Sequence, residues 1–240
     1  MHQVQEHILR IIEIVQETPQ VRLLRVEYPK GSGLTYLPGQ FFMVSLVNDP
    51  DVKVGRAYSV ASSALNSDHI EIGFDKVGVF TTKLFELKAG DALRFKGPYG
   101  KFAFDSSFEG DVILIGAGTG ITPLMSIIRY CTDRPLPNAL RLLYSVRTPE
   151  SIIYRKELED HKGKNHHFDY TITITRPDES QERWNGKIGR IDVSMIQRAI
   201  LHPQTSVVFI CGAKEFVFSM IEMLEGMGIK KEQIKTDVWG

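Results

Sequence analysis

Gly116-Ala117-Gly118-Thr119-Gly120-Ile121-Thr122-Pro123 decides the fold of the second half of this chain, because an apolar run precedes it and a helical pattern follows it. The apolar run covers residues 112–115, and the helix is expected over residues 123–130. Glycines between a strand and a helix let the backbone approach a pyrophosphate closely. Pro123 suits the first turn of the helix, where its missing N–H would have had no partner. The stretch therefore predicts a dinucleotide-binding unit, with a tight turn that holds no ligand as the alternative.

Strands and helices alternate through the rest of this half. Strands are expected over residues 140–145, 170–175, 207–211 and 234–239, and helices over residues 152–160, 193–199 and 214–225. Such alternation predicts an α/β domain with a doubly wound parallel sheet, here residues 108–240. The ligand site of such a domain belongs at the carboxyl ends of its strands. Residues 184–190 are expected to form a hairpin or a loop.

The first half reads as short strands separated by turns. Strands are expected over residues 8–15, 21–28, 41–46, 57–61 and 69–74, with one helix over residues 81–87. Closely spaced antiparallel strands of this kind usually close into a barrel, so residues 1–107 are predicted to form an antiparallel Greek-key β-barrel. Two glycine- and proline-containing segments are expected as turns of its scaffold, Pro38-Gly39-Gln40-Phe41 and Gly97-Pro98-Tyr99-Gly100.

Composition excludes several classes of function. Lysine plus arginine equals aspartate plus glutamate, at 29 each, so no basic excess indicates a nucleic-acid partner. Cys131 and Cys211 are too few for a disulfide framework or for the four thiolates of an iron–sulfur cluster. His161, His166 and His167 have no metal-binding spacing, and no metal is expected. The first ten residues lack the apolar core of a secretory signal, and no stretch is apolar enough to span a bilayer. A cytoplasmic protein without a membrane span is therefore expected.

Arg56-Ala57-Tyr58-Ser59 supplies the groups that a tightly held flavin needs. Tyr58 can lie against the flavin ring, Arg56 can neutralise a diphosphate, and Ser59 can hydrogen-bond near N5 of the ring. Strand alternation would place Arg56 and Tyr58 on one face. The alternative is a solvated barrel face with Ser59 in a turn.

The order of these segments resembles the ferredoxin–NADP reductase family of flavoenzymes. The tetrapeptide at residues 56–59 is followed by Gly78-Val79-Phe80-Thr81, by the glycine-rich stretch and by Cys211-Gly212. The resemblance implies that FAD is held by the tetrapeptide and by Gly78, Val79 and Thr81, where a helix start offers backbone N–H groups and a hydroxyl to phosphate. A simple N-capped helix is the alternative. A diphosphate site favours bound FAD over a flavin that exchanges as a substrate.

The resemblance also places a nicotinamide nucleotide on the second half. Its pyrophosphate is expected at Gly118, Thr119, Gly120, Thr122 and Pro123. A carboxylate at the end of the second parallel strand would favour NAD, whereas an arginine favours a 2′-phosphate. Ser145 and Arg147 occupy that strand end, and Tyr154 follows. NADP(H) is therefore favoured, with NAD(H) possible because Glu150 is close.

Ser59, Cys211 and Trp239 are expected at the reacting centre. Relatives place a cysteine such as Cys211, followed by a glycine such as Gly212, beside the nicotinamide, and a terminal aromatic residue against the flavin. Asp237 resembles an acidic residue found nearby in some of them. The alternatives are a buried cysteine that acts as a small hydrophobe and a tryptophan that packs on the core.

The resemblance implies an FAD-dependent oxidoreductase that passes hydride from NAD(P)H to FAD and then electrons to a redox protein such as ferredoxin or flavodoxin. Two alternatives stay open. One is a flavin reductase or diaphorase with a small-molecule acceptor, and the other is an electron-transfer subunit of a larger enzyme. The sequence does not indicate an oligomeric state.

Overall fold

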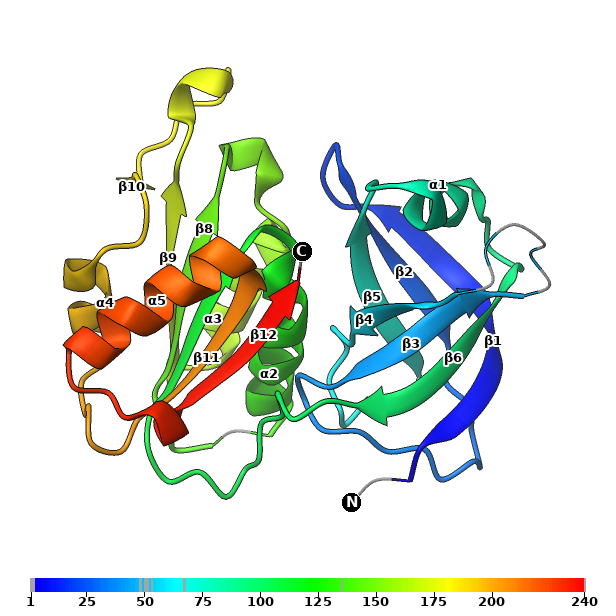
Figure 1. Ribbon diagram of the computed structural model, residues 1–240, viewed down its shortest axis with the longest axis horizontal. Coiled ribbons are helices and arrows are strands. Elements are labelled where there is room, and N and C mark those ends of the chain that lie inside the picture. Colours follow the sequence, from blue (N-terminus) through cyan, green and yellow to red (C-terminus); the bar gives the residue numbers. More distant parts are fainter. Residues whose placement is uncertain are drawn as a thin grey trace.

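The computed structural model describes residues 3–47, 49, 52, 54–66, 68–134 and 136–239. These residues form two six-stranded sheets, one in each half of the chain. The two halves lie side by side, with the N-terminal half in blue to green and the C-terminal half in green to red (Figure 1). The order of a barrel followed by a parallel sheet confirms the predicted fold class.

The first sheet is an antiparallel barrel. Its strands are β1 (Gln5–Gln16), β2 (Val21–Glu27), β3 (Phe41–Leu46), β4 (Arg56–Ser59), β5 (His69–Asp75) and β6 (Ala92–Tyr99), in the order β4-β3-β6-β1-β2-β5. A bridge between Val60 and Ile72 brings the two ends of this order together, so the barrel is nearly closed. Alternate residues such as Ile70, Ile72 and Phe74 point into its apolar core. The helix α1 (Val79–Glu86) begins two residues earlier than predicted and packs Phe80 and Leu84 on that core.

β6 corrects the prediction of a turn at residues 97–100. This strand runs to Tyr99 and lies between β1 and β3. Leu93 and Phe95 are buried whereas Lys96 is exposed, so a strand alternation is present before the glycine. The pairing of β6 with β3 shifts register opposite Phe41 and Met43, and Pro98 falls at that irregularity, where a missing N–H is tolerated. Glycine and proline therefore mark a bulge here, not the end of the strand.

The second sheet is wholly parallel. Its order is β10 (Lys187–Ile188), β9 (Phe168–Ile174), β8 (Leu140–Val146), β7 (Val112–Ala117), β11 (Val207–Ala213) and β12 (Ile234–Trp239). Chain order reverses between β7 and β11, which makes their carboxyl ends the switch point where ligands bind in such folds. β10 lies within the segment expected to be a hairpin or a loop.

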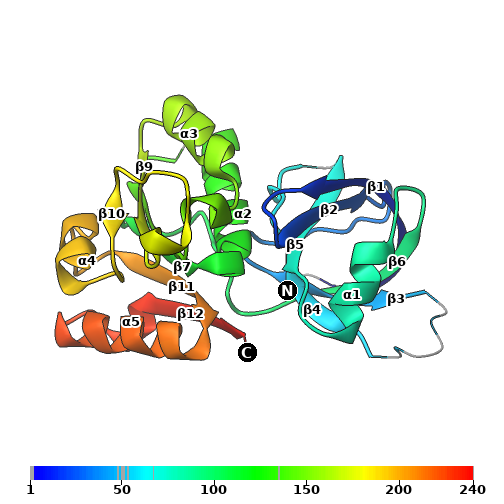
Figure 2. The ribbon, with the colours of Figure 1, turned by 90° about the horizontal axis from the view of Figure 1, so that it is seen from above.

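Helices cover both faces of the parallel sheet (Figure 2). α2 (Ile121–Asp133) and α3 (Arg155–Lys164) pack on one face, and α4 (Val193–Ala199) and α5 (Lys214–Gly226) pack on the other. Short 3₁₀ turns are η1 (Gly118–Gly120), η2 (Pro149–Ser151), η3 (Pro177–Glu179) and η4 (Lys231–Gln233). No helix in the described part of the chain combines the length and apolarity that crossing a membrane requires.

One apolar cluster crosses from the barrel to the parallel sheet. Val21, Leu23 and Ala61 of the barrel domain belong to the same buried cluster as the sheet residues Leu114 and Phe209. The segment of residues 100–111, which joins β6 to β7, contributes Phe102, whose ring meets Phe209 edge-on at 5.2 Å between centroids. The predicted domain boundary, between residues 107 and 108, falls inside this joining segment.

Removal of the Phe209 ring tests the shared cluster. Phe209 is fully buried, whereas Phe218 on α5 is 54% exposed. Phe209→Ala should lower the free energy of unfolding by about 3–5 kcal/mol, and Phe218→Ala by less than about 1 kcal/mol. Urea denaturation followed by circular dichroism measures both. Similar losses for the two variants would show that the cluster does not carry the stability assigned to it.

Candidate active site

A cleft of about 420 Å³ lies between the barrel and the parallel sheet. The barrel side contributes Phe41, Ala57, Tyr58, Ser59, Gly73, Phe74 and Asp75, and the other side Thr119, Thr122, Pro123, Cys211, Asp237, Val238 and Trp239. The second set comes from the carboxyl ends of β11 and β12 and from the start of α2, which is where the switch-point rule places a ligand. Segments that the sequence predicts for flavin and for nicotinamide therefore share one cleft.

Tyr58 forms an aromatic wall on the barrel side. Its ring stacks on Phe80 of α1 at 6.1 Å between centroids and 24° between planes, and it meets Phe74 edge-on at 6.2 Å. Burial raises the pKa of the Tyr58 hydroxyl above its ordinary value, so the ring stays neutral. The two phenylalanines fix the plane of Tyr58, and its half-buried ring lines the cleft.

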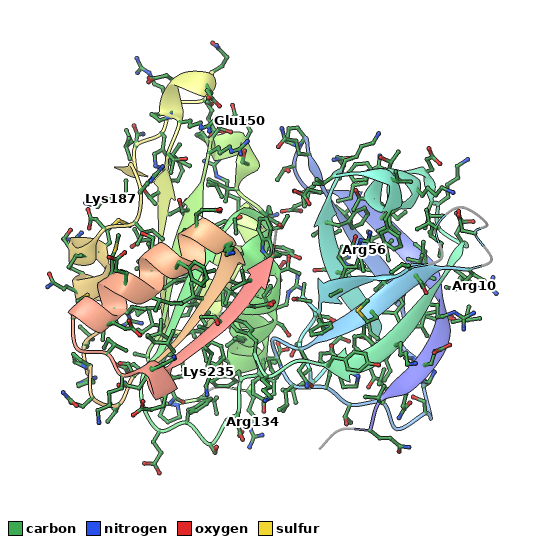
Figure 3. The ribbon with its side chains drawn as sticks, viewed as in Figure 1. Arg10, Arg56, Arg134, Glu150, Lys187 and Lys235 are labelled. Carbon is green, nitrogen blue, oxygen red and sulfur yellow. The ribbon has the colours of Figure 1, made fainter. Side chains whose placement is uncertain are left out.

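Arg56 precedes Tyr58 by two residues on β4 and is exposed. Its guanidinium donates to the carbonyl of Gly55 at 3.2 Å. Figure 3 labels Arg56 on the barrel half of the molecule. A guanidinium carries five N–H donors, so Arg56 has donors beyond the one that binds Gly55. Several charged donors on one side chain suit a diphosphate partner.

The expected phosphate segment opens α1. Gly78 has a φ of 87°, a conformation that favours glycine. The hydroxyl of Thr81 accepts from the N–H of Val77 at 2.6 Å and donates to the carbonyl of Gly78 at 3.3 Å. This hydroxyl therefore holds the loop, and the first-turn N–H groups, including that of Val79, are what the segment offers to an anion.

Ser59, Cys211 and Asp237 form a polar cluster contributed by both domains. The Ser59 hydroxyl donates to Oδ2 of Asp237 at 3.2 Å, and Sγ of Cys211 lies 3.9 Å from the same oxygen. Parallel pairing places Asp237 on β12 directly beside Cys211 on β11. Burial raises the pKa of the Asp237 carboxyl, and the hydrogen bonds from Ser59 and Cys211 oppose that rise. Burial and the neighbouring carboxylate raise the pKa of the Cys211 thiol well above its ordinary value, so it is a neutral thiol.

Asp237 is not among the site residues that the sequence predicts, although it resembles an acidic residue found in some relatives. The signal that identifies it is register. Two adjacent parallel strands that end at the same edge must place their terminal side chains side by side. Val238 and Trp239 complete this wall of the cleft.

The glycine-rich turn packs directly on the end of β11. A Cβ on Gly120 would lie 2.3 Å from the carbonyl oxygen of Cys211, so any side chain there would push the helix off the strand. Gly118 has a φ of 54°, and its carbonyl accepts from the Tyr144 hydroxyl at 2.9 Å. Thr122 donates to the carbonyl of Thr119 at 2.8 Å. The amino end of α2, which continues η1, is thereby held at the cleft, where the helix dipole favours a pyrophosphate.

Gly212 is constrained on the opposite side of the same strand end. A Cβ on Gly212 would lie 2.7 Å from Cδ1 of Phe216 on α5. Gly212 does not line the cleft, so its observed role is close packing of α5 on β11. Pro123, in contrast, lies in the cleft wall beside Thr122.

An arginine pair lies at the ends of β8 and β9. Ser145 is buried, whereas Arg147 is exposed just beyond the strand. The backbone N–H of Arg176, which follows β9, donates to the carbonyl of Arg147 at 2.8 Å, so the two arginines adjoin. Sequence reasoning missed Arg176, because a residue after the third strand joins this edge only when the sheet order is known. Glu150, labelled near the top of this domain in Figure 3, accepts from the Ser180 hydroxyl at 2.6 Å.

Tyr154 does not join this strand end. It is 2% exposed, and its hydroxyl donates to Oε1 of Glu71 in the barrel at 3.1 Å. Its backbone N–H donates to Oε1 of Glu17, also in the barrel, at 2.6 Å. The structure therefore places Tyr154 in the contact between the domains, away from the open edge where a 2′-phosphate was expected to meet it.

Comparison with known proteins identifies both halves. Residues 8–104 match the oxidoreductase FAD-binding domain, and residues 114–222 match the oxidoreductase NAD-binding domain. Ferredoxin–NADP reductase B of Sorangium cellulosum is 30% identical over 237 residues, which cover 95% of each chain. The chain belongs to the ferredoxin–NADP reductase family of flavoenzymes.

Two further comparisons show a longer relative and a shared fold. The glycine betaine monooxygenase reductase subunit of Chromohalobacter salexigens is 28% identical over 98% of this chain, but this chain spans only 64% of that protein. A ferredoxin–NADP⁺ reductase from Neisseria gonorrhoeae, solved with bound FAD and NADP, shares the fold with a TM-score of 0.82 at 21% identity, over 97% of this chain and 98% of its own.

The residues of the cleft fit the flavin that this family of enzymes binds. The volume of the cleft lies within the range of small-molecule sites, and its lining combines aromatic side chains with hydroxyl, thiol and carboxyl groups. Tyr58 and Trp239 offer an aromatic face from each domain, and Ser59 adds a hydroxyl from the barrel side. Arg56 and the first turn of α1 are the groups available to the diphosphate.

The raised pKa of Asp237 predicts a pH dependence of stability. A carboxyl whose pKa is higher in the folded state binds its proton more tightly there, so the free energy of unfolding falls as pH rises from about 3.8 through the folded pKa. Asp237→Asn removes this step. Relative to the wild type, the variant should therefore gain stability across that window, by about 1.4 kcal/mol for each unit by which the pKa is raised.

Urea denaturation of both proteins at a series of pH values between 4 and about 8 measures the difference. Ser59→Ala is the matched variant, because it removes a hydrogen bond to the ionised carboxylate and should widen the window. A difference between the wild type and Asp237→Asn that stays constant with pH would contradict the raised pKa.

Proposed function

We propose that this protein transfers hydride from NADPH to a bound FAD and passes the electrons to a redox protein of the ferredoxin or flavodoxin class. The observation that carries the proposal is the cleft itself, where Ser59 of the barrel meets Cys211 and Asp237 of the parallel sheet. FAD, when bound, supplies the conversion of a hydride into single electrons. The protein contributes orientation, exclusion of water and a proton-binding group.

Each member of the polar cluster of Ser59, Cys211 and Asp237 has a distinct part. The Ser59 hydroxyl donates to Oδ2 of Asp237 at the boundary of the domains, and this hydrogen bond fixes the direction of the hydroxyl. Asp237 is a titratable group of the cleft, and its raised pKa allows it to hold a proton. Cys211, as a neutral thiol at the end of β11, is a compact and polarisable wall for the nicotinamide.

A protein acceptor is supported by the names of the relatives. One is named a ferredoxin–NADP reductase and matches over nearly its full length, and another is named the reductase subunit of a monooxygenase. Steady-state turnover against ferredoxin, flavodoxin, free FMN and ferricyanide tests the proposal. We expect the largest kcat/KM with a protein acceptor. The largest kcat/KM with free FMN would indicate a flavin reductase instead.

The preference for NADPH rests on the arginine pair at the ends of β8 and β9. Arg147 and Arg176 are adjacent through the backbone, and guanidinium groups suit a 2′-phosphate. Arg176 forms an ion pair with Glu179 at 3.1 Å, so the assignment depends mainly on Arg147. Glu150, the nearby carboxylate that could favour NADH, accepts instead from the hydroxyl of Ser180. Ser145 lies near the end of β8 and is buried, so it is less accessible to a phosphate than Arg147.

Arg147→Ala should raise the KM for NADPH by about 10–100-fold and leave that for NADH within about twofold. A charge-assisted hydrogen bond contributes about 1.5–3 kcal/mol, and only NADPH carries the phosphate that receives it. Arg198→Ala is the control. Arg198 is exposed in the last turn of α4, which packs on the face of the sheet away from α2 and α3. Equal losses with both nucleotides would make Arg147 a structural residue, and a wild-type preference for NADH would reverse the assignment.

A further inference from the structure

One face of α2 runs along the barrel. Ser126 donates from its hydroxyl to the carbonyl of Ser62 at 2.7 Å, and Arg129 donates to Oε1 of Glu71 at 2.7 Å. Toward the cleft, a Cβ on Gly73 would lie 3.1 Å from Oγ1 of Thr122. Thr122, Ser126 and Arg129 are spaced four and three residues apart, which places them on one stripe of the helix. The amino end of α2 at the cleft and its anchor at Arg129 are therefore parts of one rigid element about 10 Å apart.

Glu71 is the centre of this anchor. Its side chain has no solvent exposure. Oε2 accepts from Nε of Arg25 at 2.7 Å, and Oε1 accepts from Arg129 and from the hydroxyl of Tyr154. Burial alone would raise the pKa of Glu71, but Arg129 and Arg25 outweigh it and hold that pKa below its ordinary value. An ionised buried carboxylate without one of these partners would be uncompensated.

Arg129 connects this carboxylate to the helix that follows. Its Nε and Nη2 donate to both oxygens of Glu157 on α3, at 2.6 and 2.8 Å. Its guanidinium also lies 5.0 Å from the ring centroid of Tyr154. The planar guanidinium thus joins β5, α2 and α3 with directed bonds.

Tyr154 adds backbone strain at the same place. Among the described residues it is the one non-glycine residue with a positive φ, 59°. Such a conformation costs about 1–3 kcal/mol and persists where the surroundings impose it. Here the surroundings are Glu17, Glu71 and Arg129, and two of these three belong to the barrel.

We propose that Glu71, Arg129 and Tyr154 are positioning residues for hydride transfer, because they fix the register of α2 and the nucleotide domain against the barrel. The proposal rests on the proposed function, since it assigns these residues a part in that reaction. The Ser59–Asp237 hydrogen bond depends on the same register, because each domain supplies one of its partners. A shift of the nucleotide domain on the barrel separates the groups that meet in the cleft, and small displacements there slow a reaction strongly.

Two variants test the proposal, with a third as control. Glu71→Gln removes the charge that both arginines share, and Tyr154→Phe removes only one hydroxyl, which preserves folding. Arg94→Met is the control, because Arg94 forms an exposed ion pair with Glu6 within the barrel, at 2.6 Å. Stopped-flow reduction of the bound flavin at saturating NADPH or NADH gives the limiting rate and the dissociation constant of the nucleotide separately.

We expect the limiting rate to fall about tenfold in Tyr154→Phe and up to about a hundredfold in Glu71→Gln. FAD content and the nucleotide dissociation constant should stay within about threefold of the wild type, and Arg94→Met should match the wild type in all three. Lowered Tm values together with unchanged limiting rates in both variants would make the network purely structural and overturn the proposal.

A distance measurement separates this proposal from the proposed function. The described cysteines are buried, so spin labels attach selectively at Lys88→Cys on the barrel and Glu225→Cys on α5, both exposed positions. Pulsed electron paramagnetic resonance should give a broader or shifted distance distribution in Glu71→Gln than in Arg94→Met. Identical distributions overturn the positioning role. A wild-type protein that binds no FAD would end the proposed function, and a wild-type protein that binds FAD while the variants behave as the control would end the positioning role alone.

Discussion

A carboxylate that has lost all contact with water constrains the whole arrangement. Glu71 remains ionised inside the protein because Arg25 from its own domain and Arg129 from the other both donate to it. Loss of either arginine would leave the buried carboxylate uncompensated, which is strongly destabilising. The distance between Glu71 and each arginine can therefore change little. The network therefore acts mainly through geometry, by allowing one relative placement of the domains.

That placement creates the cleft. The barrel presents Tyr58 and Ser59 at the end of β4, and the parallel sheet presents the start of α2 with the ends of β11 and β12. Gly120 has no side chain, so its backbone packs closely on the carbonyl of Cys211. This contact brings the start of α2 and the end of β11 together at the switch point. The polar cluster of Ser59, Cys211 and Asp237 is assembled from segments that are about 150 residues apart in sequence, as the separation between Ser59 and Cys211 shows.

The local patterns in the sequence sufficed for most of the fold and for much of the site. Apolar runs, glycine-rich turns and helix signals are properties of neighbouring residues, so five strands of the parallel sheet, its helices and five of the barrel strands were predicted. The short edge strand β10 was missed, because a hairpin or a loop was expected there. β6 was missed because glycine and proline were interpreted as a turn, whereas the register of β3 accommodates them as a bulge. Asp237, Arg176 and the true surroundings of Tyr154 depend on strand order and domain contact, which no local pattern contains. The partners of Tyr154, Glu17 and Glu71, both belong to the barrel, so they are known only once the two domains are placed together.

The apolar cluster that crosses the domain boundary has a consequence for how such proteins evolve. Barrel residues such as Val21 and Leu23 share a core with Phe209 of the sheet, so separation of the halves would expose apolar area on each. Recombination that joined this barrel to a foreign nucleotide domain would expose apolar area on both parts unless the new contact were complementary. The two halves are therefore expected to be inherited together and to change in a correlated way at this contact.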